Sequence, residues 1–281
     1  LRPKFMKRIL VPTDFSQQAE YALKVAAQFA KTHNADIYLL HMLELLMQLI
    51  DTTSNNNSQN LPESLFFMKL AHKRFEEVLA SDYLEGVTVH ETVHFHEAFD
   101  GIMEVSKEHD CDLIIMGSHG ATGFKEMFIG SNTEKVVRYS EIPVLVIKQE
   151  IPNFRVDNFI FATDFSEETK RPFNEAVKFA NKIDANIHLV YINTANKFKT
   201  TEEAEKKMSN FLEGMESKTF NLHIYNDRTI EEGILNYAQS IDAGLIGIST
   251  HGRKGLAHFF NGSLSEDIVN HAKRPVITFK I

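Results

Sequence analysis

The sequence predicts an α/β fold of two tandem doubly wound domains, each a five-stranded parallel sheet with helices on both faces. Three observations predict this fold. The chain has 281 residues, enough for two domains of ordinary size. The segment RILVPTDFS at residues 8–16 recurs as NFIFATDFS at residues 158–166, which marks an internal repeat. Within each copy, short apolar runs alternate with helical patterns, as in βαβ units.

The two copies differ in length. Their opening motifs are 150 residues apart, whereas the later Gly-Ser pairs, at Gly130 and Gly262, are 132 residues apart. The second copy is therefore 18 residues shorter. The polar segment 52–60 is the expected site of the difference, as an unselected surface insertion or as a functional lid. We predict domains at residues 6–150 and 151–281, named the first half and the second half below, joined by a short linker.

The expected elements follow the same order in both halves. Strands are short apolar runs that end at a turn; they are residues 7–11, 37–41, 87–95, 113–116 and 144–147, then 158–162, 187–191, 220–225, 245–248 and 276–279. Helices have apolar residues at helical spacing; they are residues 16–33, 62–81, 98–109 and 132–139, then 166–183, 200–218, 230–240 and 264–271. Ser16 and Ser166 are the expected N-caps of the first helix in each half.

Composition excludes several classes of protein. The net charge of −8 argues against binding to nucleic acid or to an anionic membrane, although backbone amides can still bind a phosphate. No apolar run reaches the roughly 20 residues of a membrane span, and no secretory signal is visible. The single cysteine, Cys111, lies between two aspartates, which disfavour a reactive thiolate. We expect a cytoplasmic protein.

A glycine-rich loop follows the fourth strand of the first half. Gly117, Gly120, Gly130 and Ser131 give the spacing G-x2-G-x9-G-S. Glycines let the backbone approach a ligand, and the amides of Gly130, Ser131 and Asn132 open a helix, where unpaired N–H groups favour an anion. The spacing is neither a Walker A loop nor the G-x-G-x-x-G of dinucleotide folds. Without a phosphate lysine, the loop favours nucleotide binding over fast hydrolysis.

Three segments together resemble the universal stress protein family: PTDFS at residues 12–16, the glycine spacing, and IPVLV at residues 142–146. The resemblance implies that the first half binds ATP, ADP or AMP in a sheet of order 3-2-1-4-5, with Mg²⁺ or Mn²⁺ carried on the phosphates. It also implies a set of site residues by position, which are Pro12, Asp14, Met42, Met116, Gly117, Gly120, Gly130, Ser131 and Asn132.

The resemblance also implies a role for each part of that set. Asp14 would accept from ribose hydroxyls or lie beside the adenine, and the backbone at Met42 would contact the base. Gly117 and Gly120 would lie along the ribose and phosphates, and residues 130–132 would hold the phosphates.

The second half departs from the family pattern. The matching residues are Asp164, Gly252, Gly262 and Ser263. Ser249 stands where the first motif glycine is expected and Ala162 where the proline is expected. Ser249 adds a side chain where the backbone should approach the nucleotide, whereas Arg253 and Lys254 add positive charge beside the loop. The first half is the better candidate, and nucleotide binding by the second half stays open.

Histidines provide two further candidate sites. His90, His94 and His96 alternate along an expected strand, so they can share one face of it. They would form either a zinc site or a polar face of the strand. The polar face is favoured, because no further cluster of ligands is evident in the sequence. His119 and His251 share one loop position, as a general acid–base or as a structural histidine bonded to backbone. No partner nucleophile is evident, so the structural role is favoured and no catalytic residue is assigned.

These features favour an adenine-nucleotide-binding stress-response or signalling module without rapid turnover. The alternatives are a slow ATPase or nucleotide-transferring enzyme, and a structural dimerisation protein with a relic motif. The apolar last strands, residues 144–147 and 276–279, would be exposed sheet edges if the halves stood apart. We therefore expect an intramolecular pseudo-dimer joined antiparallel along these strands, with a homodimer of whole chains left open.

Overall fold

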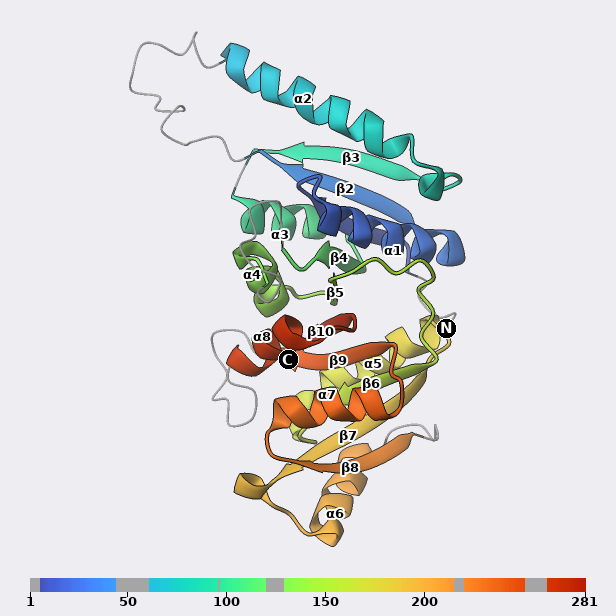
Figure 1. Ribbon diagram of the computed structural model, residues 1–281, viewed down its shortest axis with the longest axis vertical. Coiled ribbons are helices and arrows are strands. Elements are labelled where there is room, and N and C mark those ends of the chain that lie inside the picture. Colours follow the sequence, from blue (N-terminus) through green and yellow to red (C-terminus); the bar gives the residue numbers. More distant parts are fainter. Residues whose placement is uncertain (1–5, 44–60, 96, 120–128, 215–219, 251–261) are drawn as a thin grey trace, which may run out of the picture.

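Ten strands in the described part of the chain form a single twisted sheet. The computed structural model describes residues 6–43, 61–95, 97–119, 129–214, 220–250 and 262–281. The sheet has the order β3-β2-β1-β4-β5-β10-β9-β6-β7-β8 (Figure 1). Strands are parallel within each half, and only the central pair, β5 and β10, is antiparallel. The predicted α/β class and the order 3-2-1-4-5 are confirmed in both halves.

The observed elements follow the expected order, although α5 begins at Lys170 rather than 166 and α6 ends at Leu212 rather than 218. Those of the first half are β1 (Arg8–Thr13), α1 (Gln17–His33), β2 (Asp36–Met42), α2 (Leu61–Leu79), η2 (Asp82–Leu84), β3 (Val89–His94), α3 (Ala98–Glu108), β4 (Leu113–Gly117), α4 (Ser131–Tyr139) and β5 (Val144–Ile147). Those of the second half are β6 (Asn158–Ala162), η3 (Glu167–Thr169), α5 (Lys170–Lys182), β7 (Asn186–Thr194), η4 (Ala195–Lys197), α6 (Thr201–Leu212), β8 (Asn221–Asp227), α7 (Ile230–Ser240), β9 (Leu245–Thr250), α8 (Gly262–His271) and β10 (Val276–Lys280). Segment 52–60 lies outside the described residues.

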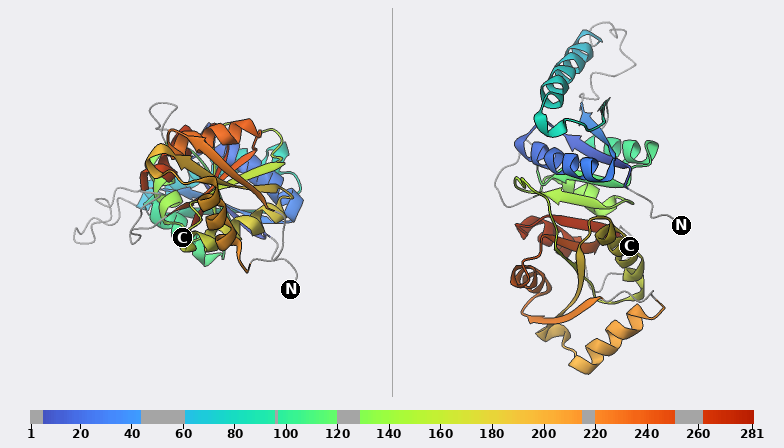
Figure 2. Two further views of the ribbon diagram at one scale, coloured as in Figure 1. Left: turned by 90° about the horizontal axis from the view of Figure 1, so that it is seen from below. Right: turned by 90° about the vertical axis from the view of Figure 1, so that its right-hand side faces the viewer.

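Helices cover both faces of the sheet, because successive strand residues point to opposite sides. Apolar side chains of α1, α2, α5 and α6 pack on one face, and those of α3, α4, α7 and α8 pack on the other. Figure 2 shows helices on both sides of the twisted sheet. Each buried cluster contains residues from both halves. The two halves therefore share a continuous apolar core on each face.

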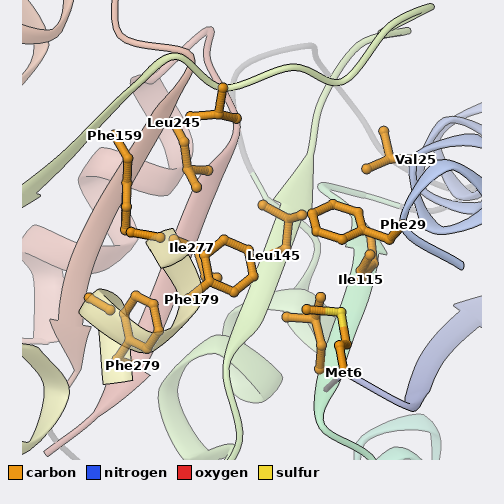
Figure 3. Packing of buried hydrophobic residues seen from close by; sticks show 14 of the residues in the cluster. Met6, Val25, Phe29, Ile115, Leu145, Phe159, Phe179, Leu245, Ile277 and Phe279 are labelled. Atoms are coloured by element: carbon orange, nitrogen blue, oxygen red, sulfur yellow. The ribbon is translucent and has the colours of Figure 1, made fainter. Parts of the chain in front are cut away.

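The junction between the halves is built on β5 and β10. Leu145 pairs with Ile277, and both are fully buried. Phe29 of α1 and Phe179 of α5 approach this pair from their own halves, with ring centroids 6.1 Å apart (Figure 3). The side-chain amide of Gln28 donates to the carbonyl of Ile151 (3.1 Å) and its oxygen accepts from the amide of Phe154 (2.7 Å), which fixes the linker against α1.

The first helices of the two halves begin differently. Ser16 caps α1 as predicted, since its side chain accepts from the amide of Ala19 (3.3 Å). The same prediction for Ser166 is wrong, because its side chain makes no cap hydrogen bond. A 3₁₀ turn, η3, follows Ser166 instead, and α5 begins only at Lys170.

Candidate functional site

A cavity of about 400 Å³ lies in the first half, where the carboxyl ends of β1, β2 and β4 meet the start of α4. Its lining contains every described first-half residue of the predicted set: Pro12, Asp14, Met42, Met116, Gly117, Gly130, Ser131 and Asn132. Gly120 lies outside the described residues. Parallel strands present their carboxyl ends at one edge of the sheet, and the change of strand order between β1 and β4 opens a crevice there.

The turn after β1 holds Asp14 at the cavity. The amide of Phe15 donates to the Thr13 hydroxyl (3.0 Å) and that of Ser16 donates to the Asp14 carboxylate (3.0 Å). Phe15 has a φ of 60°, a left-handed conformation that is unusual for a bulky side chain. Its ring packs on His41, with centroids 4.6 Å apart. Packing of this ring keeps a strained turn in place, and the turn presents an exposed carboxylate to the cavity.

The start of α4 forms the opposite wall. Gly130 is the N-cap of α4 and has no side chain to satisfy the first helical amides. Its own amide donates to the carbonyl of Ser118 (2.7 Å), so it is already paired, contrary to the expectation that it faces a phosphate. Thr133 donates its hydroxyl to the carbonyl of Gly117 (3.0 Å) and fixes α4 to β4. The next amides, those of Ser131 and Asn132, are therefore the better anion donors.

Gly117 has a structural reason to be glycine. A Cβ at this position would lie 2.9 Å from the backbone carbon and oxygen of Gln18, in the first turn of α1. The close approach of α1 to β4 thus requires glycine, independently of any ligand. The family resemblance implies only an approach of the ribose and phosphates at this glycine.

Sequence reasoning missed residues that shape the cavity from below. Gly101 of α3 lies under Met42, and a Cβ there would be 2.2 Å from the Met42 Cε. Leu40 and Ile102 line the same end of the cavity and are buried. The signal for Gly101 was available, because Gly233 occupies the corresponding place in the second half and meets Ile192 in the same way.

The histidine candidates take different places. His119 lines the cavity, and its Nδ1 lies 3.0 Å from the Ser118 hydroxyl, so its partner is a side chain rather than the expected backbone. His90 is exposed and stacks on Tyr38, with its Nε2 3.3 Å from the Asp36 carboxylate. His96 and His251 lie outside the described residues. Within the part of the chain that the structure describes, no group of three metal-ligating side chains is found.

The second half arranges the corresponding residues differently. Asp164 is 8% exposed, whereas Asp14 is exposed. Thr169, at the position of Ala19, is buried, and its hydroxyl lies 2.9 Å from that of Thr163. Burial raises the pKa of Tyr191, and the Asp164 carboxylate raises it further. The carboxylate of Asp164 is thus less accessible to a ligand than that of Asp14.

The second-half motif is only partly described. Ser249 is fully buried, and its hydroxyl finds no hydrogen-bond partner among the described residues. Gly262 begins α8 with Ser263 as its next residue, and Gly252 lies outside the described residues.

Comparison with known proteins decides the family. The model of the universal stress protein family matches residues 6–148 and again residues 156–280. The chain belongs to the universal stress protein family. It carries two copies of the family's domain in tandem, so the resemblance inferred from the sequence is confirmed.

Individual members of the family match one copy or both. A universal stress protein of Methanocaldococcus jannaschii is 32% identical over 155 residues, covering 51% of this chain and 96% of that protein. A universal stress protein of Synechocystis is 24% identical and covers 98% of this chain and 100% of that protein. The crystal structure of a universal stress protein from Archaeoglobus fulgidus has a TM-score of 0.74 at 23% identity, covers 98% of both chains, and shares the tandem fold.

No helix in the described part of the chain is both long and apolar enough to cross a membrane.

Proposed function

We propose that the first half binds an adenine nucleotide, ATP, ADP or AMP, in the cavity at the ends of β1, β2 and β4. One observation carries the proposal. Asp14, which is expected to contact a ribose, and Gly117, Gly130, Ser131 and Asn132 of the expected phosphate loop are far apart in the sequence but line a single cavity. Its volume of about 400 Å³ lies within the range of small-molecule sites, roughly 300–1,000 Å³.

The strand order indicates how a nucleotide would be oriented in the cavity. β2 and β4 flank β1, so Asp14 at the end of β1 stands between two chemically different walls. The β2 side is apolar, with Leu40, Met42 and Ile102, and suits a purine base. The β4 side offers the hydroxyl of Ser131 and the first amides of α4, which suit phosphates. A ribose would then lie at Asp14, whose carboxylate can accept from its hydroxyls.

We further propose binding without rapid turnover. The described lining of the cavity contains Asp14 as its one carboxylate and includes neither lysine nor arginine. Phosphoryl transfer relies on cations that stabilise the charge of the transition state. In this proposal Mg²⁺ or Mn²⁺ accompanies the phosphates rather than a protein cage, as hard divalent cations usually do. The protein would act as a stress-response or signalling module in the cytoplasm.

The two halves have unequal roles in this proposal. Asp164 is buried and Ser249 replaces the motif glycine, so we assign one nucleotide to each chain. The antiparallel pairing of β5 with β10 and the shared cores support a permanent intramolecular pseudo-dimer, with domains at residues 6–150 and 151–281.

The Asp14→Asn variant tests the ribose contact. Asparagine keeps an oxygen for the amide of Ser16 but loses the negative charge, so the turn should remain folded. A hydrogen bond to a charged group contributes about 1.5–3 kcal/mol, so calorimetry should show roughly 10- to 100-fold weaker ATP binding. Binding of 2′,3′-dideoxy-ATP should be weak and insensitive to the change. Equal ATP affinity in both proteins would contradict the assignment, and ATP turnover within about 1–100 s⁻¹ would favour an enzyme.

A further inference from the structure

The two halves exchange a symmetric pair of contacts at the ends of their last strands. Lys148, just after β5, donates to the carbonyl of Asn270 in α8. Lys280, at the end of β10, donates to the carbonyl of Arg138 in α4 (3.0 Å). Both lysines, and both acceptors, are 132 positions apart, the offset of the repeat. Each half therefore uses a lysine to cap the last helix of the other, where the helix dipole favours a cation.

Asn270 makes a second contact across the junction. Its side-chain oxygen accepts from the backbone amide of Ile129, with 2.6 Å between oxygen and nitrogen. Ile129 comes directly before Gly130, the N-cap of α4 and part of the cavity wall. Two consecutive amides are thus fixed: that of Ile129 by the second half and that of Gly130 by the carbonyl of Ser118.

The contact lies next to the amides that are proposed to hold the phosphates. The phosphate-facing amides of Ser131 and Asn132 follow Gly130 immediately, so their direction depends on how the chain enters α4. Anion binding by helix amides requires donors that already point at the ligand. A donor set that is held in place before binding loses less conformational freedom on binding.

We propose that Asn270 is a positioning residue for the phosphate end of the first-half site, so that the second half completes the binding site of the first. The inference rests on the proposed nucleotide function and adds to it a dependence between the halves. Asn270 lies in the last turn of α8, the helix that begins at Gly262 in the motif of the second half. A change at the second motif could thus reach the first site through one helix of ten residues.

Three variants of the full chain test the role of Asn270. Asn270→Ala removes the acceptor for the Ile129 amide, whereas Asn270→Asp keeps an oxygen at the same place. Lys280→Met removes the mirror contact at Arg138 and serves as the control for a general loosening of the junction. Amide hydrogen exchange at Ile129, followed by NMR without nucleotide, reports the contact itself. Calorimetric titrations with ATP and with adenosine report its consequence.

We expect Asn270→Ala to speed exchange at Ile129 and to weaken ATP binding about 3- to 10-fold, the effect of one lost hydrogen bond. Adenosine affinity should not change, because the contact lies at the phosphate end. Asn270→Asp and Lys280→Met should stay within about 2-fold of the wild type for both ligands.

Other outcomes separate this inference from the proposed function. Wild-type ATP affinity in Asn270→Ala, or an equal loss for ATP and adenosine, would overturn the role of Asn270 while leaving nucleotide binding in place. If the wild-type chain bound no adenine nucleotide, the proposed function would fail. Exchange at Ile129 would then decide alone whether Asn270 holds the start of α4, and unchanged exchange in Asn270→Ala would overturn that too.

Discussion

Exchanging the residues at positions 117 and 249 tests why the two halves begin their first helices differently. In Gly117→Ser, the new Cβ would lie 2.9 Å from the backbone of Gln18, closer than relaxed contacts allow. Overpacking costs about 1–3 kcal/mol, and a buried unpaired hydroxyl costs about 1–3 kcal/mol more. If the helix relaxes by giving up its first turn, part of this cost is relieved, and α1 would then begin late, as α5 does at Lys170. We therefore expect a loss of about 2–4 kcal/mol.

The reverse exchange, Ser249→Gly, is the matched control. It removes a buried hydroxyl without a partner among the described residues, a gain of about 1–3 kcal/mol. The glycine also gives the unfolded chain more conformational freedom, which lowers the stability of the folded chain by about 0.5–1 kcal/mol. This variant should therefore be as stable as the wild type or slightly more stable.

Thermal unfolding followed by circular dichroism measures both exchanges, because the chain contains no tryptophan. For domains of this size 1 kcal/mol shifts the midpoint by roughly 2–4 °C, so Gly117→Ser should melt about 5–15 °C lower. If Gly117→Ser unfolded at the same temperature as the wild type while Ser249→Gly unfolded at a lower one, steric pressure on α1 would not explain why the first helices of the two halves begin differently.

Three further predictions follow from shifted pKa values. Burial lowers the pKa of His188 and of His223, whose rings stack with centroids 5.5 Å apart. As the pH falls below 6.5, these histidines become protonated in the unfolded chain before they do in the folded chain, so the free energy of unfolding should decrease. The decrease should be smaller in His223→Gln. An equal pH dependence of stability in the wild type and in His223→Gln would contradict this. Burial raises the pKa of Cys111 to about 12, so its native thiolate fraction should be about 1,000-fold lower than in urea, and a thiol reagent reacting equally fast in both would refute it. Burial lowers the pKa of Lys148 to about 8, so stability should rise with pH between about 8 and 10.5. Lys148→Met should lack that rise, and an identical profile would exclude the lysine as its source.

The sequence predicted most of the fold because the strands are buried on both faces and the repeat displays each element twice. Residues 230–240 and 144–147 were placed with the bounds that the structure gives to α7 and β5. The start of α5 could not be predicted, because Ser166 looks like a good cap in sequence. We infer that Ser249, 83 positions away in the chain, obstructs the first turn, because the matching Gly117 leaves no room for a Cβ beside Gln18.

The candidate site was predictable in its composition but not in its details. Motif spacing identified Asp14 and the loop around Gly130, and parallel strands necessarily bring these to one edge. The hydrogen bond from the Gly130 amide to the Ser118 carbonyl could not be predicted, because the sequence does not tell a free backbone amide from a paired one. The contribution of Asn270 was equally hidden, because it joins residues 141 positions apart across the junction.

The stoichiometry of ATP binding tests the central claim most directly. Calorimetry on the full chain with Mg²⁺ should give one ATP per chain. Gly130 has a φ of −67° and a ψ of 150°, which any residue can adopt, so Gly130→Leu should fold yet abolish binding by filling the cavity. Gly262→Leu, the same change in the second half, should leave one ATP bound. Binding that survives Gly130→Leu but is lost in Gly262→Leu would place the nucleotide in the second half and contradict the account.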